Sequence, residues 1–275
     1  MSDMDKMQST ELGEAKMASK DITPVLSGWT YEAGTINVRK IVGTDGSPKL
    51  QMRLDLGLLQ MELSGRPDGQ RPNGFESLLE YFEDKLAKHK TANGTPLGFS
   101  LTRSQCQMLR EEAMMYYHRY LSLFVLDDYP GVIRDTARNL RVLDLCVQFA
   151  GHEQDRFVLE QYRPYITMMN TRARAKLLLG EGKIPEAEAV VMGALKTIRR
   201  FFRNFGQPEA FAHSNEVRVL RGTLREIRKS LPANPLKKLE VRLSKAVKEE
   251  RYEEAAKLRD EINRLQEQSP KKSND

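Results

Sequence analysis

Apolar side chains recur every three or four positions through most of residues 75–229, a spacing that gathers them on one face of an α-helix. The pattern is clear in residues 104–125, and it continues in 127–145 and 154–179. It is interrupted by glycine-rich or polar stretches at residues 91–98, 151, 180–185 and 204–215. We therefore expect a body of packed helices and a fold that is mainly α.

Nearer the N-terminus, apolar and polar residues alternate, as they do in half-buried strands. The alternation covers residues 36–42 and 49–56, and Asp45 followed by Gly46 is typical of the turn in a β-hairpin. Residues 56–63 either extend the second strand or form a third. A sheet of this size is marginal alone, so we expect this small antiparallel β element to pack against the helices that follow it.

Helical periodicity returns in residues 234–268, which we expect to form two short helices joined by a tight turn. Asn234 is a good helix N-cap, and Pro235 suits the first helical position. Each helix has one narrow apolar face, formed by Leu236, Leu239, Leu243, Ala246 and Val247 in the first and by Tyr252, Ala255, Leu258, Ile262 and Leu265 in the second. A unit this small, with no cysteine, needs another surface to dock on.

This segment resembles the UVR motif, a helical hairpin shared by bacterial excinuclease subunits B and C. The motif also occurs in some Clp-type chaperone ATPases and in the activator of the bacterial protein-arginine kinase. The matching residues include the run YEEAAKLRDEI, and they are Leu243, Ala246, Val247, Tyr252, Glu253, Ala255, Ala256, Leu258, Arg259, Asp260, Ile262 and Leu265.

In those families the hairpin is a protein–protein contact that pairs with a second UVR hairpin or with another partner. The resemblance therefore implies a set of partner-binding residues: Leu239, Leu243, Val247, Tyr252, Ala255, Leu258, Arg259, Ile262 and Leu265. The alternative is that the hairpin packs against the helices of its own chain.

These patterns divide the chain into five parts. We expect a disordered tail at 1–20, a β-hairpin element with a Gly/Pro loop at 21–74, the helical body at 75–229, the UVR-like hairpin at 230–268, and a disordered tail at 269–275. Two prolines in residues 230–235 should make the connection to the hairpin short and stiff.

Residues 171–198 also resemble a tetratricopeptide helix pair, and residues 117–140 repeat the pattern less well. The resemblance rests on Ala175 and Leu178 in the first helix, Gly182 at the turn, and Ala187, Val191 and Ala194 in the second. Ordinary antiparallel helix packing explains the same small residues, because they let two helices approach closely. Two partial copies about 55 residues apart do not establish a repeat array.

Basic residues gather in residues 196–229, where nine Lys or Arg and three Glu give a net charge of +6, equal to that of the whole chain. Arg199, Arg200 and Arg203 interleave with phenylalanines, whereas Arg218, Arg221, Arg225 and Arg228 share one helical face. An acidic protein or a nucleic acid would relieve the repulsion among these arginines. Alternatively, Phe201, Phe202 and Phe205 are core residues, and the arginines meet acids of the hairpin such as Glu240, Glu249, Glu250 or Glu253.

The loop at residues 64–74 is a second candidate binding element, since long Gly/Pro loops on a scaffold often bind ligands. Its candidate residues are Arg66, Asp68 and Arg71, although such a loop can also be a simple connector.

Signals for catalysis are weak. The chain has no phosphate-binding GxxxxGK[ST] loop and no GxGxxG or HExxH sequence, so we expect no cofactor, no metal and no catalytic residue. The acidic pairs Glu111–Glu112 and Asp127–Asp128 are expected to face water. Its two cysteines form no CxxC pair, which also separates the chain from the arginine-kinase activators and their metal sites. A remaining alternative is an enzyme of an unrecognised kind with its active site at the loop 64–74.

With no apolar run of membrane-spanning length and no signal-peptide pattern, we expect a cytoplasmic, bacterial-type protein that does not bind membranes. The leading hypothesis is a non-enzymatic adaptor whose hairpin binds a UVR-like or other helical protein surface, including a second copy of itself. The alternatives are a nucleic-acid-binding accessory factor of nucleotide excision repair and a regulator of a Clp-type chaperone or protease.

Overall fold

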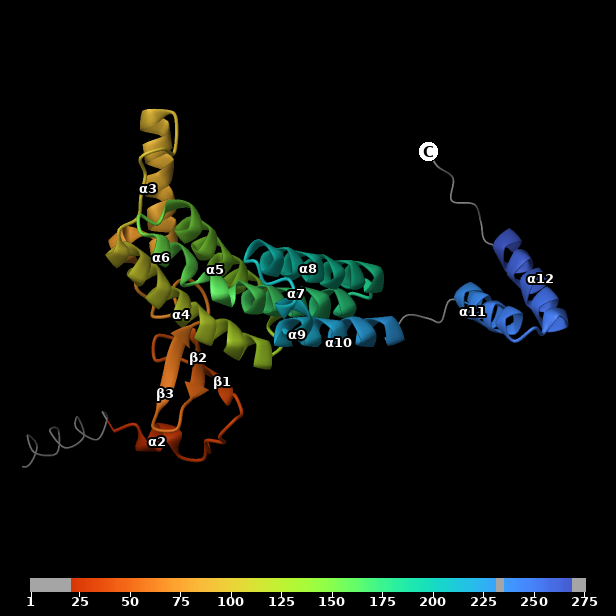
Figure 1. Ribbon diagram of the computed structural model, residues 1–275. Coiled ribbons are helices and arrows are strands. Elements are labelled where there is room, and N and C mark those ends of the chain that lie inside the picture. Colours follow the sequence, from red (N-terminus) through yellow and green to blue (C-terminus); the bar gives the residue numbers. More distant parts are fainter. Residues whose placement is uncertain (1–20, 231–234, 269–275) are drawn as a thin grey trace, which may run out of the picture.

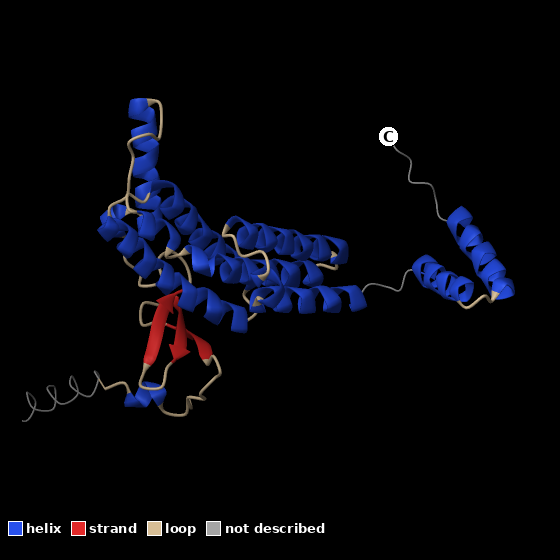
Figure 2. Cartoon of the chain, viewed as in Figure 1, coloured by secondary structure: helices blue, strands red, loops and turns tan. Residues whose placement is uncertain are grey.

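The computed structural model describes residues 21–230 and 235–268, without the side chains of 235–238, 240–241 and 265–268. The tails expected at 1–20 and 269–275, and the cap predicted at Asn234, lie outside the described residues. The described chain is mainly helical, with one three-stranded antiparallel sheet near its N-terminal end (Figure 1 and Figure 2). The fold class predicted from the sequence is confirmed.

The sheet follows the short helix α2 (Thr23–Leu26) and has the order β1-β2-β3, formed by β1 (Val38–Val42), β2 (Pro48–Arg53) and β3 (Leu58–Glu62). A third strand therefore exists, rather than an extension of the second. Gly46 has a φ of 75° in the first turn, a conformation that favours glycine. Leu50, Met52 and Met61 are buried on one face of the sheet, and this face packs against the helical body as expected.

The helical body contains α3 (Leu78–Asn93), α4 (Arg103–Val125), α5 (Tyr129–Phe149), α6 (Glu153–Phe157), α7 (Arg163–Gly180), α8 (Ile184–Asn204), α9 (Ala210–His213) and α10 (Asn215–Ser230). Two short 3-10 helices, η1 (Pro72–Gly74) and η2 (Glu160–Tyr162), interrupt the connections. Residues 154–179, expected to form one or two helices, are divided into α6, η2 and α7. Pro164 is the second residue of α7, in the first turn, where its missing N–H costs nothing.

Side chains near the helix starts fix where these helices begin. Thr102 and Gln105 form a reciprocal capping box at α4, with N···O distances of 3.3 and 2.9 Å. Asp128 caps α5 by accepting from the backbone N–H of Gly131 at 3.2 Å. Gly94, with a φ of 69°, ends α3 in the left-handed conformation that glycine adopts readily.

Two apolar cores lie inside the body. The first joins the sheet to the C-terminal half of α4 and to α7, α8 and α10, with Tyr120 and Leu220 among its buried residues. The second joins α3 to the N-terminal half of α4 and to α5, and it includes Cys106 and Cys146. Both cysteines are free and buried, and burial raises the pKa of the Cys146 thiol to about 12. Such a thiol stays protonated and unreactive at neutral pH.

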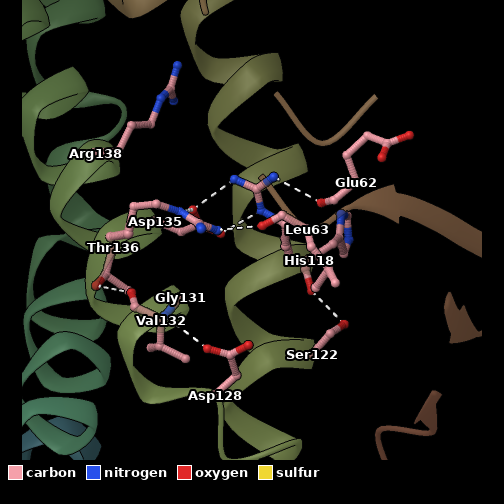
Figure 3. A network of polar contacts seen from close by, with 12 residues as sticks. Glu62, Leu63, His118, Ser122, Asp128, Gly131, Val132, Asp135, Thr136 and Arg138 are labelled. Atoms are coloured by element: carbon pink, nitrogen blue, oxygen red, sulfur yellow. Dashed lines mark hydrogen bonds and ion pairs between the residues drawn. The ribbon is translucent and has the colours of Figure 1, made fainter. Parts of the chain in front are cut away.

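A buried ion pair fastens the end of the sheet to α4 and α5. Arg119 donates from Nε and Nη2 to the two oxygens of Asp135, at 2.7 and 2.8 Å, and both side chains are almost fully buried. Its Nη1 donates to the backbone carbonyl of Glu62 at the end of β3, at 3.0 Å. Arg134 adds a hydrogen bond to the carbonyl of Leu63 at 3.0 Å. Figure 3 shows this network between the strand and the two helices.

Glu112 forms a second buried polar cluster, which corrects the expectation that Glu111–Glu112 faces water. Only 1% of Glu112 is exposed, because adjacent residues of a helix point in directions about 100° apart. Its carboxylate accepts from the backbone N–H of Leu78 at 2.8 Å and pairs with Arg138 and, at 3.4 Å, with Arg66. Burial lowers the pKa of the Arg138 guanidinium, and Glu112 supplies the opposite charge that this buried cation needs.

Helices α7 and α8 pack side by side as an antiparallel pair around Ala175, Ala187 and Val191, all fully buried. Gly182 has a φ of 74° in the turn between them. In the part of the chain that the structure describes, nothing identifies this pair as a tetratricopeptide repeat.

Candidate partner-binding hairpin

The C-terminal hairpin consists of α11 (Pro235–Lys248) and α12 (Tyr252–Gln268), joined by three residues. The backbone N–H of Arg251 donates to the carbonyl of Ala246 at 2.8 Å, and that of Glu250 donates to the carbonyl of Val247 at 3.1 Å. These two bonds make a Schellman C-cap, in which one residue must be left-handed. That residue is Glu250, whose φ is 59°.

A small apolar core holds the two helices together. It is built from Leu239 and Ala246 of α11 and from Ala255, Leu258 and Ile262 of α12, with Leu243 partly buried beside them. Ala246 and Ala255 leave room for the helices to approach closely, and the three larger side chains fill the space along the contact. Every residue of this cluster belongs to the hairpin, so the core is separate from the two cores of the body.

Among the described side chains of the hairpin, two large apolar ones are mostly exposed and lie outside its core. Val247 is 51% exposed at the end of α11, and Tyr252 is 67% exposed at the start of α12, so they flank the turn. Arg259 is also exposed, with its guanidinium 3.6 Å from the carboxylate of Asp260. Of the predicted partner-binding residues, Leu239, Ala255, Leu258 and Ile262 therefore contact each other, while Val247, Tyr252 and Arg259 face outward. The side chain of Leu265 lies outside the described residues.

Charged side chains bridge the turn and the two helices. Arg251 pairs with Glu249 and Glu254, and Arg242 of α11 reaches Glu254 of α12 at 3.8 Å. Exposed pairs of this kind each contribute about 0.2–1 kcal/mol. The hairpin therefore depends on its small core for most of its stability.

The predicted basic residues lie on α8 and α10. Arg218, Arg221, Arg225 and Arg228 line one hollow of about 420 Å³, together with His213 and Ser214. The guanidinium carbons of Arg199 and Arg221 lie 4.7 and 5.5 Å from the ring centre of Phe211. Arg200 and Arg203 are exposed on α8, outside the lining of this hollow.

The sequence suggested acidic residues of the hairpin as partners of these arginines, but the partners found lie on α8 and α10. Arg228 pairs with Glu188 of α8 at 2.8 Å, and Arg218 donates to the side-chain oxygen of Asn215 at 2.6 Å. Within residues 21–230 and the described side chains of the hairpin, no carboxylate forms an ion pair with Arg218, Arg221 or Arg225. The side chain of Glu240, one suggested partner, is not described.

The three phenylalanines between the arginines do not share one environment. Phe202 packs against the first core, whereas Phe205 is 42% exposed. Phe205 contacts Phe201, with ring centres 4.6 Å apart, and Phe157 of α6 at 6.1 Å.

The charged residues of the Gly/Pro loop at 64–74 differ in their exposure to solvent. Arg66 is turned inward, where its Nε lies 3.4 Å from Glu112 and 3.2 Å from Asp68. Asp68 also accepts from the backbone N–H of Gln70 at 3.0 Å, and exposed Arg71 donates weakly to the carbonyl of Gly74 at 3.4 Å. Arg66 and Asp68 thus contribute to the loop's own structure.

Among the described helices, none combines the length and hydropathy that a membrane crossing requires. No group of three or more His, Cys, Asp or Glu side chains within the described residues could hold a metal ion. Sequence patterns also did not indicate that Tyr117 and Tyr120 of α4, Tyr162 of η2 and Tyr165 of α7 line one hollow. The sequence shows how these tyrosines are spaced within α4 and within residues 162–165, but it does not show that the two segments lie side by side.

Comparison with known families identifies one part of the chain: residues 233–268 match the UvrB/uvrC motif, UVR. The match covers both helices of the hairpin and the turn between them, and it supports their interpretation as a protein-interaction element. No match to the chain was found among curated proteins. No solved structure matched it either.

Proposed function

We propose that the protein is a non-enzymatic adaptor that uses α11 and α12 to bind a helical surface of a partner protein. The observation that carries this proposal is the pair Val247 and Tyr252, large apolar side chains left mostly exposed on a hairpin whose described side chains form a core of five buried residues. A partner helix laid against them would extend that core toward a four-helix arrangement. The partner surface can be a UVR-like hairpin, which includes the hairpin of a second copy of the chain.

Aromatic residues in the centre of an interface contribute a large share of binding energy. Tyr252 offers a wide apolar ring with only two side-chain torsions to restrict. Leu243 of α11 is only partly buried, so a partner can cover more of its apolar surface. Arg259 and Asp260 supply a polar rim next to this surface.

The test is affinity capture with the full chain and a Val247→Ala/Tyr252→Ala variant, followed by mass spectrometry. Recovery of a specific partner should fall at least about tenfold in the variant, because truncating a central aromatic residue commonly costs more than 1 kcal/mol of binding free energy. The matched control is Tyr31→Ala/Val42→Ala, which removes exposed side chains of the same kinds near the sheet. Equal recovery from all three proteins would reject the proposal.

A second function is supported by the arginine hollow on α10, namely binding of a nucleic acid as an accessory factor in excision repair. Arg218, Arg221 and Arg225 lie along two turns of one helix without a carboxylate partner among the described residues. Guanidinium groups pair bidentately with phosphates, and a basic face on a chain with a pI near 9.2 is typical of nucleic-acid binders.

Electrophoretic mobility of a labelled oligonucleotide, titrated with protein at several salt concentrations, tests this second function. About four phosphate contacts predict that the logarithm of affinity falls with the logarithm of salt at a slope near −4. Arg221→Gln/Arg225→Gln should reduce that slope by roughly two and weaken binding. The control Lys88→Gln/Lys90→Gln removes two exposed charges from α3 and should have little effect. Similar losses in both variants would indicate non-specific attraction and reject this function.

A further inference from the structure

A hollow of about 440 Å³ opens where α4, α5 and α7 converge, and the first turn of α10 borders it. Its walls come from both cores of the body: Tyr120 belongs to the first, and Leu143, Leu159 and Ile166 belong to the second. The seam between two separately packed cores is a place where side chains need not interdigitate fully. The size lies within the range of 300–1,000 Å³ typical of pockets for small molecules.

Tyrosines dominate this hollow, which we call the tyrosine pocket. Tyr120 is almost fully buried, Tyr117 and Tyr165 are partly buried, and Tyr162 is 48% exposed at the edge. The ring centre of Tyr117 lies 5.5 Å from that of Tyr120 and 6.2 Å from that of Tyr165, so the rings form one aromatic group. Burial raises the pKa of Tyr165 to about 12, and therefore its hydroxyl is neutral at physiological pH.

Two charged side chains border the tyrosine pocket, and they differ in how well they are satisfied. Arg110 donates to Asp155 at 2.8 Å and to Gln107 at 2.7 Å, so its charge is balanced by a partner outside the lining. Within the described residues, the one hydrogen bond that the Glu216 side chain accepts comes from the hydroxyl of Ser214, at 2.7 Å. Among the described side chains, no Lys, Arg or His forms an ion pair with Glu216.

Burial is the main cause of the raised pKa of Tyr165, and the nearby negative charge of Glu216 adds to it. The faces of aromatic rings are also negative, and rings gathered beside a carboxylate attract organic cations. The apolar floor, formed by Ala113, Leu143 and Ile166, suits a ligand with a hydrocarbon body.

We propose that the tyrosine pocket binds a small organic cation, a molecule with an aromatic or aliphatic body and a protonated or quaternary amine. The body lies on the apolar floor, and the cationic group lies among the tyrosine rings with Glu216 as its counter-ion. This site goes beyond the adaptor function and uses no residue of the hairpin, so either proposal can fail without the other.

Calorimetric titration of the full chain with three probes of similar size tests the proposal. The probes are 2-phenylethylamine, a cation at neutral pH, the neutral 2-phenylethanol, and the anionic 3-phenylpropanoate. The amine should bind about tenfold more tightly than the alcohol, and the carboxylate should bind most weakly. Absence of amine binding at millimolar concentration, or equal affinity for amine and alcohol, would overturn it.

Two variants and one control test whether the ligand binds in the tyrosine pocket. Glu216→Gln should weaken binding of the amine about tenfold and leave binding of the alcohol unchanged, since only the amine has a charge to pair. Tyr162→Ala should weaken binding of the amine several-fold, and its exposed position spares the fold. Glu226→Gln makes the same change on α10 outside the pocket lining and should have no effect. Unchanged amine affinity in Glu216→Gln would overturn the role of the carboxylate and with it the proposal.

Discussion

Arg119 and Asp135 illustrate how single residues hold this molecule together. The two side chains are buried, doubly hydrogen-bonded to each other, and tied to the carbonyl of Glu62. Taking such charges out of water is costly, and their attraction roughly offsets that cost only while both partners are present. The pair fixes where the sheet meets α4 and α5, so its main effect is on the arrangement of the elements.

Removing one partner should therefore be far worse than removing both. We expect Asp135→Leu to lower the free energy of unfolding by about 3–5 kcal/mol, because it leaves the Arg119 guanidinium buried without a counter-charge. Arg119→Met/Asp135→Leu should recover most of this loss, apart from about 1 kcal/mol for the carbonyl of Glu62 that loses its donor. Urea unfolding followed by Trp29 fluorescence measures both, and a double variant as unstable as the single one would contradict this account.

Titration of His118 makes the stability of the folded protein depend on pH. Burial lowers its pKa below the ordinary value of 6.5, and a hydrogen bond to the backbone at Met114 opposes part of that shift. The unfolded chain therefore binds a proton more readily than the folded chain. Stability associated with neutral His118 is complete above pH 6.5 and is lost as the pH falls toward the lower, folded-state pKa.

We expect the free energy of unfolding to fall between pH 7.5 and pH 5.5, and His118→Gln to reduce that fall. Comparing the pH dependence, and not the absolute stability, separates titration from any change in packing. Asp155, whose pKa is lowered mainly by the hydrogen bond from Arg110, titrates well below this window in the folded state. Parallel profiles for the two proteins would show that His118 does not carry the effect.

At the scale of elements, the hairpin is the clearest case of local sequence deciding local structure. Its two apolar faces were visible from residue spacing, and they meet as a core of Leu239, Ala246, Ala255, Leu258 and Ile262. The turn was less predictable, because Glu250 occupies a left-handed position that usually favours glycine. The sequence also did not reveal that Glu250 completes a Schellman cap.

Glu250→Gly should stabilise the hairpin by about 1 kcal/mol, since glycine adopts a positive φ without a steric penalty. Hydrogen exchange of amides in α11 and α12 should then slow about fivefold if it proceeds by opening of the hairpin. Glu249→Gly is the matched control, because Glu249 does not have a positive φ, and it should not slow exchange. Equal effects of the two substitutions would argue against strain at Glu250.

At the scale of the whole molecule, the hairpin core is separate from both cores of the body. Removing residues 231–275 should therefore leave the free energy of unfolding of the body unchanged within about 0.5 kcal/mol. Trp29 is a suitable probe because it is the only tryptophan and lies beneath Arg39, 4.0 Å from its guanidinium carbon. A loss of 2 kcal/mol or more would show that the hairpin packs against the body, and would remove the free surface that the adaptor function needs.

The sequence alone determined the elements and the identity of the hairpin. Periods of two and of three to four residues report which side of a strand or helix is apolar, so the sheet, the helical body and the UVR match all follow from local order. Tertiary structure decided what distant residues do together. Only packing brings Glu112 next to Arg66 and Arg138, places Arg221 of α10 over the ring of Phe211, and gathers four tyrosines and Glu216 around one hollow. The reason is physical: periodicity specifies which face of an element is buried, but burial, charge pairing and cavities depend on which other element covers that face.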